Sequence, residues 1–211
     1  MPALGLRWLT PLYDGLLRIG GRERTFKGRL IEQAAIQPGE SVLDLGCGTG
    51  TLAIQVKERV PAAKVFGLDG DAAMLSRARA KARYQGVSVR FDEGLSWNLP
   101  YATASLDVVL STLFFHHLDQ VGRSRTLAEV VRVLRPGGRL YAADWGRQGS
   151  VLMKVLSLPD RLLDGLGRTA GAFAGRLPGE MKSAGLVNIA ETGTLDTAFG
   201  RLTFYTARNP E

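Results

Sequence analysis

Cysteine is nearly absent from this sequence, which has Cys47 as its one thiol among 211 residues. A lone cysteine excludes an internal disulfide and suits a reducing compartment, so we expect a cytoplasmic protein. Long apolar runs are missing as well: no stretch of about 18 apolar residues occurs, and we therefore expect no membrane-spanning helix. The apolar N-terminus is broken by Arg7, Pro11 and Asp14, and it lacks a clean signal-peptide core and cleavage site.

Acidic residues are in the minority, with 20 Asp and Glu against 27 Lys and Arg, so the formal net charge is +7. Such a surplus can favour anionic partners, for example nucleic acid or the headgroups of acidic lipids. The basic residues are mostly scattered arginines, however, and they do not form a run with interleaved aromatic residues. This pattern favours an ordinary basic enzyme surface, and nucleic acid is not the expected partner.

The chain as a whole predicts one globular domain over residues 1–211, because 45% of it is hydrophobic and 22% charged. From residue 41 onward, short apolar runs alternate with helical stretches, which is typical of a doubly wound parallel α/β sheet. The expected strands are Ser41–Leu45, Lys64–Asp69, Val87–Phe91, Leu106–Ser111, Gly138–Asp144, Val187–Thr192 and Leu202–Ala207. The last two are joined without an obvious crossover helix, so at least one of them could run antiparallel.

Helices are expected between these strands. Asp71 is predicted to cap a helix that Gly86 ends, and Asp119 to open another that the RPGG segment ends. The apolar face of the second helix is expected to carry Leu127, Val130, Val131 and Leu134. Residues 1–40 are expected to form helical extensions, and a short helix is expected near Pro178–Ala184.

The segment SVLDLGCGTGTLA places Gly46, Gly48 and Gly50 directly after the first expected strand. Glycines allow positive φ and close approach of a ligand, and the free N–H groups at the start of the following helix favour negative charge. A strand, a glycine-rich turn and a helix in this order predict a nucleotide site at the carboxyl ends of the strands. A tight turn without a ligand is the alternative.

Two acids sharpen this prediction. Asp44 ends the first strand, where a buried carboxylate needs a positive or N–H-bearing partner, such as the ammonium group of an amino-acid moiety. A dinucleotide pyrophosphate would not supply one. Asp69 ends the second strand and is placed to accept hydrogen bonds from two ribose hydroxyls.

Four segments resemble the class I S-adenosylmethionine-dependent methyltransferases: VLDLGCGTG, VFGLDGD, LPYATASLDVVLSTLFFHHL and EVVRVLRPGGRLYAADWG. The resemblance is specifically to the small-molecule branch similar to ubiquinone/menaquinone-biosynthesis methyltransferases, and it covers residues 40–145. It implies a Rossmann-like sheet of seven strands, mostly parallel with one antiparallel strand near the C-terminus. It also implies methyl transfer from S-adenosylmethionine, with S-adenosylhomocysteine as the product.

The resemblance assigns expected roles around this cofactor. Gly46, Cys47, Gly48 and Gly50 would wrap its methionine end, with Asp44 near the amino group. Asp69 would hold the ribose, Gly70 would let the adenosine lie close, and Ser111 would lie where the methionine part passes. Met74 could pack on the adenine or belong to the core, Tyr13 could cover the cofactor, and Cys47 itself is expected to be a small filler.

One position departs from the family pattern. Where relatives often carry an acid that flanks the adenine, this chain has Leu95 in the segment GLSW. Adenine recognition is therefore expected to rest on backbone groups of Leu95 and Ser96 and on apolar stacking.

Methyl transfer from a sulfonium can be catalysed largely by alignment and exclusion of water, so no nucleophile is required. The two histidines, His116 and His117, follow the fourth strand and are the candidate general bases, with His117 ranked first. A structural hydrogen bond at the start of the next helix is the alternative. Asp144 stands alone beside Trp145, so no metal is expected, and this acid could touch substrate or cap a loop.

The expected acceptor is a small apolar or aromatic molecule, such as a quinone precursor or a lipid. Residues 146–177, and Leu152–Leu166 in particular, resemble a lid over such a molecule, lined further by Phe114, Phe115 and Trp145. The alternative functions are those of an RNA methyltransferase and of a cofactor-binding partner subunit without transferase activity. The N-terminal segment could also rest on a membrane surface, and the oligomeric state is not predicted.

Overall fold

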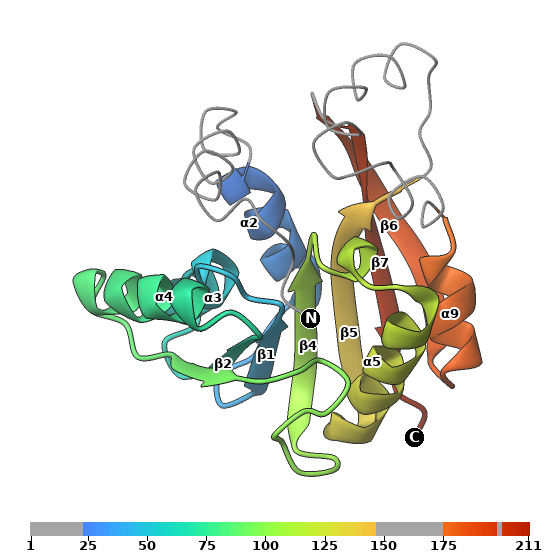
Figure 1. The fold of residues 1–211 in the computed structure, drawn as a ribbon, viewed down its shortest axis with the longest axis horizontal. Coiled ribbons are helices and arrows are strands. Elements are labelled where there is room, and N and C mark those ends of the chain that lie inside the picture. Colours follow the sequence, from blue (N-terminus) through green and yellow to red (C-terminus); the bar gives the residue numbers. More distant parts are fainter. Residues whose placement is uncertain (1–22, 147–174, 198–199) are drawn as a thin grey trace.

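A computed structural model describes residues 23–146, 175–197 and 200–211. Its centre is a seven-stranded sheet in the order β3-β2-β1-β4-β5-β7-β6 (Figure 1). The strands are β1 (Ser41–Leu45), β2 (Lys64–Asp69), β3 (Arg90–Glu93), β4 (Leu106–Thr112), β5 (Leu134–Trp145), β6 (Val187–Thr197) and β7 (Gly200–Arg208). Strands β1 to β5 pair in parallel, and β7 runs antiparallel to both of its neighbours, β5 and β6. The predicted mostly parallel sheet with one antiparallel strand is confirmed.

Helices cover both faces of this sheet. They are α2 (Glu23–Ala34), α3 (Thr51–Arg59), α4 (Ala72–Tyr84), α5 (Gln120–Val133) and α9 (Leu177–Ser183). The buried side chains of α2, α3 and α4 belong to one hydrophobic cluster, and those of α5 and α9 belong to a second cluster. Each helix therefore buries one apolar face, which is what a doubly wound sheet requires. Helix α2 lies within residues 1–40, where the sequence predicted helical extensions.

Both predicted N-caps are present. The Asp71 side chain accepts a hydrogen bond from the Ala73 N–H at 2.8 Å, and Asp119 accepts one from the Gly122 N–H at 2.7 Å. A carboxylate at this position satisfies backbone donors that have no partner within the helix. The helices that lead away from β2 and β4 therefore begin where the sequence predicted.

Several strand boundaries differ from the prediction, most of all the start of β3, the start of β5 and the end of β6, which reaches Thr197 and not Thr192. The third strand was expected at Val87–Phe91 but begins at Arg90, because the Val87 N–H is used to close the end of α4 on the Ala82 carbonyl at 3.0 Å. Leu134 was expected on the helix but starts β5, where it pairs with Leu106. The pairing then shifts so that Val108 faces Arg139, and the RPGG segment lies within this irregularity.

The strand order also fixes where a ligand can bind. From β1 the chain crosses first to β2 on one side, and β4 later returns to the other side of β1. The carboxyl ends of β1 and β4 therefore border the point at which the strand order reverses, where doubly wound sheets form a crevice. The glycine loop follows β1, and the two histidines follow β4, so both lie at this edge.

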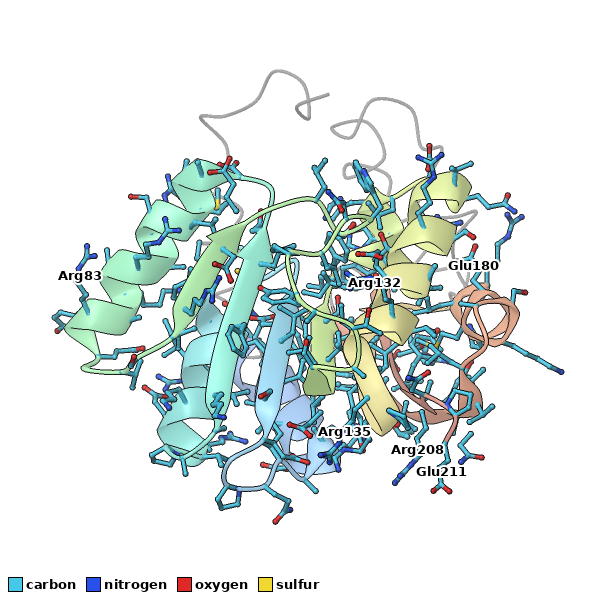
Figure 2. All side chains as sticks on the ribbon, turned by 90° about the horizontal axis from the view of Figure 1, so that it is seen from below. Arg83, Arg132, Arg135, Glu180, Arg208 and Glu211 are labelled. Atoms are coloured by element: carbon cyan, nitrogen blue, oxygen red, sulfur yellow. The ribbon has the colours of Figure 1, made fainter. Side chains whose placement is uncertain are left out.

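Charged side chains are distributed around the molecule (Figure 2). Arg83 projects from α4 on one side of the view, and Arg208 lies at the end of β7 on the other. Several arginines are neutralised by acids: Arg139 binds Glu40 at 2.8 Å, and Arg123 binds Glu180 at 2.7 Å. No helix among the described residues has the length and apolar character needed to cross a membrane.

Candidate active site

The glycine loop between β1 and α3 has a backbone that other residues would not readily adopt. Gly46, Gly48 and Gly50 have φ values of +70°, +51° and +72°, in the left-handed region. A Cβ at Gly46 would collide with the Phe114 ring, and one at Gly50 would lie 2.7 Å from the ring of Phe91. A Cβ at Gly48 would meet nothing within 4 Å, so the surroundings of this residue are open.

Asp44 lies beneath this loop, at the end of β1, and is only 1% exposed. Its Oδ2 accepts a hydrogen bond from the Ala53 N–H at 3.0 Å, in the first turn of α3, whereas its buried Oδ1 has no hydrogen-bond partner among the described residues. Burial raises the pKa of Asp44 to about 7, and the positive charge of Lys27 opposes that shift. A buried carboxylate oxygen without a donor is costly, so this atom is suited to a cationic or N–H-bearing ligand.

Asp69, at the end of β2, holds the loop in place. Its Oδ2 accepts the Gly48 N–H at 2.7 Å, and its Oδ1 accepts the Asp71 N–H at 3.0 Å. The residue is half-buried, and each carboxylate oxygen retains acceptor capacity beyond these bonds. Asp69 therefore positions backbone that borders the crevice, a role that sequence reasoning missed, and its contact with a ribose stays a prediction.

A cavity of about 110 Å³ lies between the loops after β1, β2, β3 and β4. It is lined by Gly46, Leu68, Asp69, Gly70, Gly94, Leu95, Ser96, Trp97, Phe114 and Leu118. The fold thus brings together five of the predicted cofactor residues: Gly46, Asp69, Gly70, Leu95 and Ser96. Sequence reasoning did not assign Trp97 or Leu118 to the site. In the structure Trp97 is 41% exposed and Leu95 50% exposed. The sequence signal that could have indicated this part of the cavity is the presence of these two large apolar residues in one loop.

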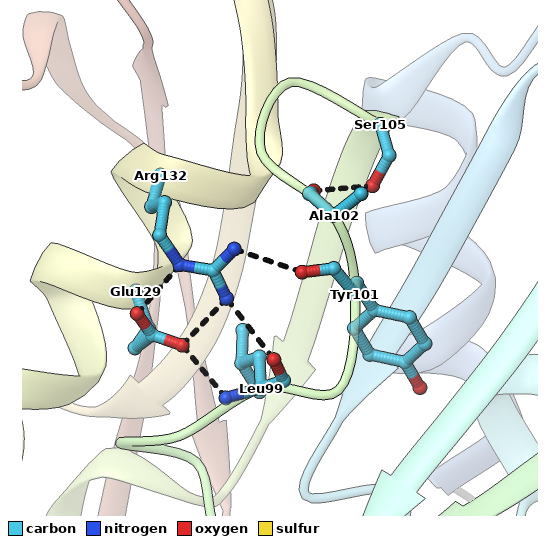
Figure 3. Close-up of polar contacts among 6 residues, drawn as sticks. All are labelled: Leu99, Tyr101, Ala102, Ser105, Glu129 and Arg132. Atoms are coloured by element: carbon cyan, nitrogen blue, oxygen red, sulfur yellow. Dashed lines mark hydrogen bonds and ion pairs between the residues drawn. The ribbon is translucent and has the colours of Figure 1, made fainter.

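The loop that carries Leu95–Trp97 is fastened to α5. The Ser96 hydroxyl is buried and lies 2.7 Å from that of Thr126. Glu129 accepts the Leu99 N–H at 2.7 Å, while Arg132 donates to the carbonyls of Leu99 and Tyr101 at 3.0 and 2.8 Å (Figure 3). The hydrogen bond from Arg132 also lowers the pKa of Glu129. These contacts hold the loop against α5, and the Ser96 hydroxyl is taken up by its bond to Thr126.

Six other predicted cofactor residues among those described do not line this cavity: Asp44, Gly48 and Gly50, which are discussed above, and Ser111, Met74 and Cys47. Ser111 is buried and donates its hydroxyl hydrogen to the Leu45 carbonyl at 3.0 Å, so it joins β4 to β1 just below the glycine loop. Met74 is half-buried on α4. Cys47 is buried, and desolvation raises the pKa of its thiol, which therefore stays neutral. A neutral buried thiol suits the predicted role of a small filler.

The two histidines lie in η1 (Phe115–His117), and their environments differ. His116 is 6% exposed, and its Nδ1 lies 2.7 Å from Oδ1 of Asp144. His117 is exposed, with its ring centroid 3.9 Å from that of His116. Although His117 is in contact with solvent, the protein around its ring desolvates it, and this desolvation, followed by repulsion from His116, lowers the pKa of His117 to about 4. Asp144 was expected to have no second acid beside it; its contact with a histidine from the loop after β4 is a feature that sequence reasoning missed.

Asp144 also fixes the backbone of that loop. Its Oδ2 accepts the Phe114 N–H at 3.1 Å, and its Oδ1 accepts the Trp145 N–H at 2.7 Å. The residue before Phe114 is Leu113, which has a φ of +53°, a strained value for a side chain of this type. The Asp144 carboxylate thus positions two groups: Phe114, whose ring lies against Gly46, and the buried ring of His116. Tyr13 and the expected lid at Leu152–Leu166 lie outside the described residues.

Comparison with known proteins agrees with this geometry. A family model described as a methyltransferase domain matches residues 42–138. A demethylmenaquinone methyltransferase from Thermus thermophilus is 37% identical over 139 residues, which is 65% of this chain and 62% of that protein. Residues 42–138 therefore form a methyltransferase domain, which is similar to the class I S-adenosylmethionine-dependent methyltransferases. A second demethylmenaquinone methyltransferase, from Deinococcus radiodurans, is 39% identical over 139 residues, covering 65% of this chain and 57% of that protein.

The match to these relatives is partial: the chain covers about three fifths of their length. The fold similarity extends further. The YcgJ protein of Bacillus subtilis has a TM-score of 0.72 and covers 88% of this chain and 98% of its own, at 18% identity. The two proteins therefore share one fold over most of their length.

Proposed function

We propose that this methyltransferase transfers a methyl group from S-adenosylmethionine to a quinone-type aromatic acceptor. The proposal that S-adenosylmethionine is the methyl donor rests on the buried Oδ1 of Asp44, which has no partner among the described residues and lies beneath the open glycine loop. An amino-acid ammonium group would give this oxygen the donor that the protein does not supply. The proposal that the acceptor is of the quinone type is supported by the two relatives named demethylmenaquinone methyltransferases and by the apolar surface of Leu95 and Trp97 at the cavity.

The described residues fit this cofactor from end to end. Asp44 would bind its ammonium group, and the loop at Gly46–Gly50 would let the chain approach its methionine part. Asp69 would accept hydrogen bonds from the ribose with the acceptor capacity that it retains. Gly70 and the backbone of Leu95 and Ser96 would border the adenine. When bound, the cofactor supplies an electrophilic methyl group on a sulfonium.

The contribution of the protein to this reaction is chiefly positional. Displacement of a sulfonium requires the acceptor in line with the methyl group and water excluded from the site. The ring of Phe114, which lies against Gly46, and the neighbouring Leu118 provide apolar walls at the cavity. The neutral Cys47 thiol has no part in this chemistry.

The test is methyl transfer by the purified full chain with methyl-labelled S-adenosylmethionine. Three acceptors are offered separately: a chemically reduced naphthoquinone with an unsubstituted ring carbon, phospholipid vesicles, and total RNA. We expect label in the naphthoquinol alone, and we expect Asp44→Asn to abolish it. Label in lipid or RNA would refute the acceptor class. Failure of calorimetry to detect any binding of S-adenosylmethionine would refute the donor as well.

A further inference from the structure

His116 and Asp144 form a buried pair of base and acid at the sheet edge, and the binding of the methyl donor proposed above does not use this pair. Both side chains are almost fully buried, with exposed fractions of 8% and 1%, and they are joined at 2.7 Å. A carboxylate accepts hydrogen bonds and cannot donate them, so the short contact places a proton on Nδ1 of His116. The other ring nitrogen, Nε2, then carries a free lone pair.

Nε2 of His116 has no hydrogen-bond partner among the described residues, whereas Nδ1 is directed into the protein. The ring is flanked by His117 and by Trp145, whose ring centroids lie 3.9 and 6.3 Å away. Two residues earlier in the chain, Phe114 lines the cavity and lies on Gly46. Because Asp144 holds both the Phe114 N–H and the His116 ring, the histidine is fixed relative to the glycine loop.

We propose that His116 takes the proton from the methyl acceptor, and that Asp144 is a positioning residue that keeps Nε2 free to do so. The proposal rests on the proposed function and reverses the order that the sequence favoured for the two histidines. His117 is exposed and has no carboxylate hydrogen-bonded to its ring among the described residues, so nothing there selects one tautomer.

The proton transfer balances the charge of the reaction. An O–H bond of the acceptor breaks and an N–H bond forms at Nε2, while the methyl group exchanges its bond to sulfur for a bond to the unsubstituted ring carbon. The hydrogen of that carbon then moves to the acceptor oxygen, which restores the aromatic ring. The electron pair of the broken carbon–sulfur bond stays on sulfur as a neutral thioether. The positive charge lost from the sulfonium reappears on the imidazolium, which faces the Asp144 carboxylate and is stabilised by it. Release of that proton to solvent restores the base.

The tautomer can be tested on the wild-type protein without any acceptor. Nitrogen-15 NMR of the labelled histidines should show His116 with its proton on Nδ1. Asp144→Asn replaces an acceptor by an amide that can also donate, so the proton should shift toward Nε2. Finding wild-type His116 protonated on Nε2 would overturn the proposal, even if the acceptor class is wrong and even if a variant fails to fold.

Kinetics provide the second test, on the acceptor that receives label. His116→Gln should lower kcat by about 10²- to 10⁴-fold while S-adenosylhomocysteine affinity and the acceptor KM change little. Asp144→Asn should lower kcat comparably, and the double variant should be no slower than the worse single one, because the two residues act as a unit. A large loss of kcat in His117→Gln with full activity in His116→Gln would overturn the assignment and leave the proposed function intact.

Discussion

Asp44 is the residue whose charge state couples binding to pH. Its pKa in the free protein is raised to about 7, whereas an amino-acid ammonium group binds only the carboxylate. We therefore expect the affinity for S-adenosylmethionine to rise by roughly tenfold per pH unit between pH 5.5 and 7, and then to level off. Isothermal titration calorimetry at several pH values measures this dependence of the S-adenosylmethionine affinity on pH. In Asp44→Asn the affinity should be low and independent of pH over that range.

The same residue also predicts a trend in stability. Because its folded-state pKa lies above that of an unfolded chain, Asp44 favours folding below pH 4 and loses this contribution as pH rises through about 7. The neutral amide of Asp44→Asn does not ionise, so the melting temperature of the ligand-free variant relative to wild type should increase from pH 5 to pH 8. A difference that stays constant across this range would contradict burial as the cause of the shift.

Gly48 offers a sharper test of the loop, because Gly86 is a matched control. Both have positive φ, at +51° and +66°, and a Cβ at either would meet nothing within 4 Å. Gly48→Ala and Gly86→Ala should therefore each lower stability by about 1–2 kcal/mol through backbone strain. Only Gly48→Ala should also weaken cofactor binding, since only Gly48 belongs to the glycine loop after β1. Equal affinities in calorimetry would remove the loop from the site.

At the scale of elements, α5 acts on the cavity through the loop that it fastens. Arg132→Met removes the donors that bind the Leu99 and Tyr101 carbonyls and leaves Glu129 with its bond to the Leu99 N–H alone (Figure 3). We expect a several-fold rise in the dissociation constant of S-adenosylhomocysteine, because the loop beside the adenine loses its support. Glu129→Gln should act in the same direction, with non-additive effects in the double variant.

Arg201→Met is the control for this comparison, since it breaks an exposed ion pair with Asp196 on the β6–β7 hairpin. It should leave the dissociation constant unchanged. If Arg132→Met and Arg201→Met have the same affinity as wild type, then the loop keeps its shape without α5.

The elements were predictable wherever a local signal marks them. The bounds of β1 and β2 and the caps at Asp71 and Asp119 follow from apolar runs and from a polar residue at a helix start, both of which are encoded locally. The start of β3 was not predictable, because tertiary packing decides whether the Val87 N–H bonds to α4 or to a neighbouring strand. The His116–Asp144 contact joins residues 28 positions apart, one in η1 after β4 and the other near the end of β5, and no spacing rule in one sequence shows which acid a histidine will meet.

At the scale of the whole molecule, one sheet edge collects the groups of the site from distant parts of the chain. The loops after β1, β2 and β3 border the cavity, the loop after β4 brings Phe114 and His116, and the end of β5 brings Asp144. Parallel pairing puts all of these carboxyl ends at the same edge, so a single fold rule accounts for their meeting. The methyl donor and the proton acceptor are therefore expected on adjacent loops of one crevice.

The surface charge gives the last prediction, which concerns the whole chain. Its net charge of +7 would favour RNA if the basic side chains formed one patch, yet Arg83 and Arg208 lie on different sides, and Arg123 and Arg139 bind acids. Binding through many phosphate contacts would lose about 10³- to 10⁵-fold in affinity between 50 and 200 mM salt. A small neutral acceptor releases no counterions, so methyl transfer to the naphthoquinol should change less than twofold over this range. Labelling that falls steeply with salt, and that RNA competes away, would instead identify an anionic polymer as the acceptor.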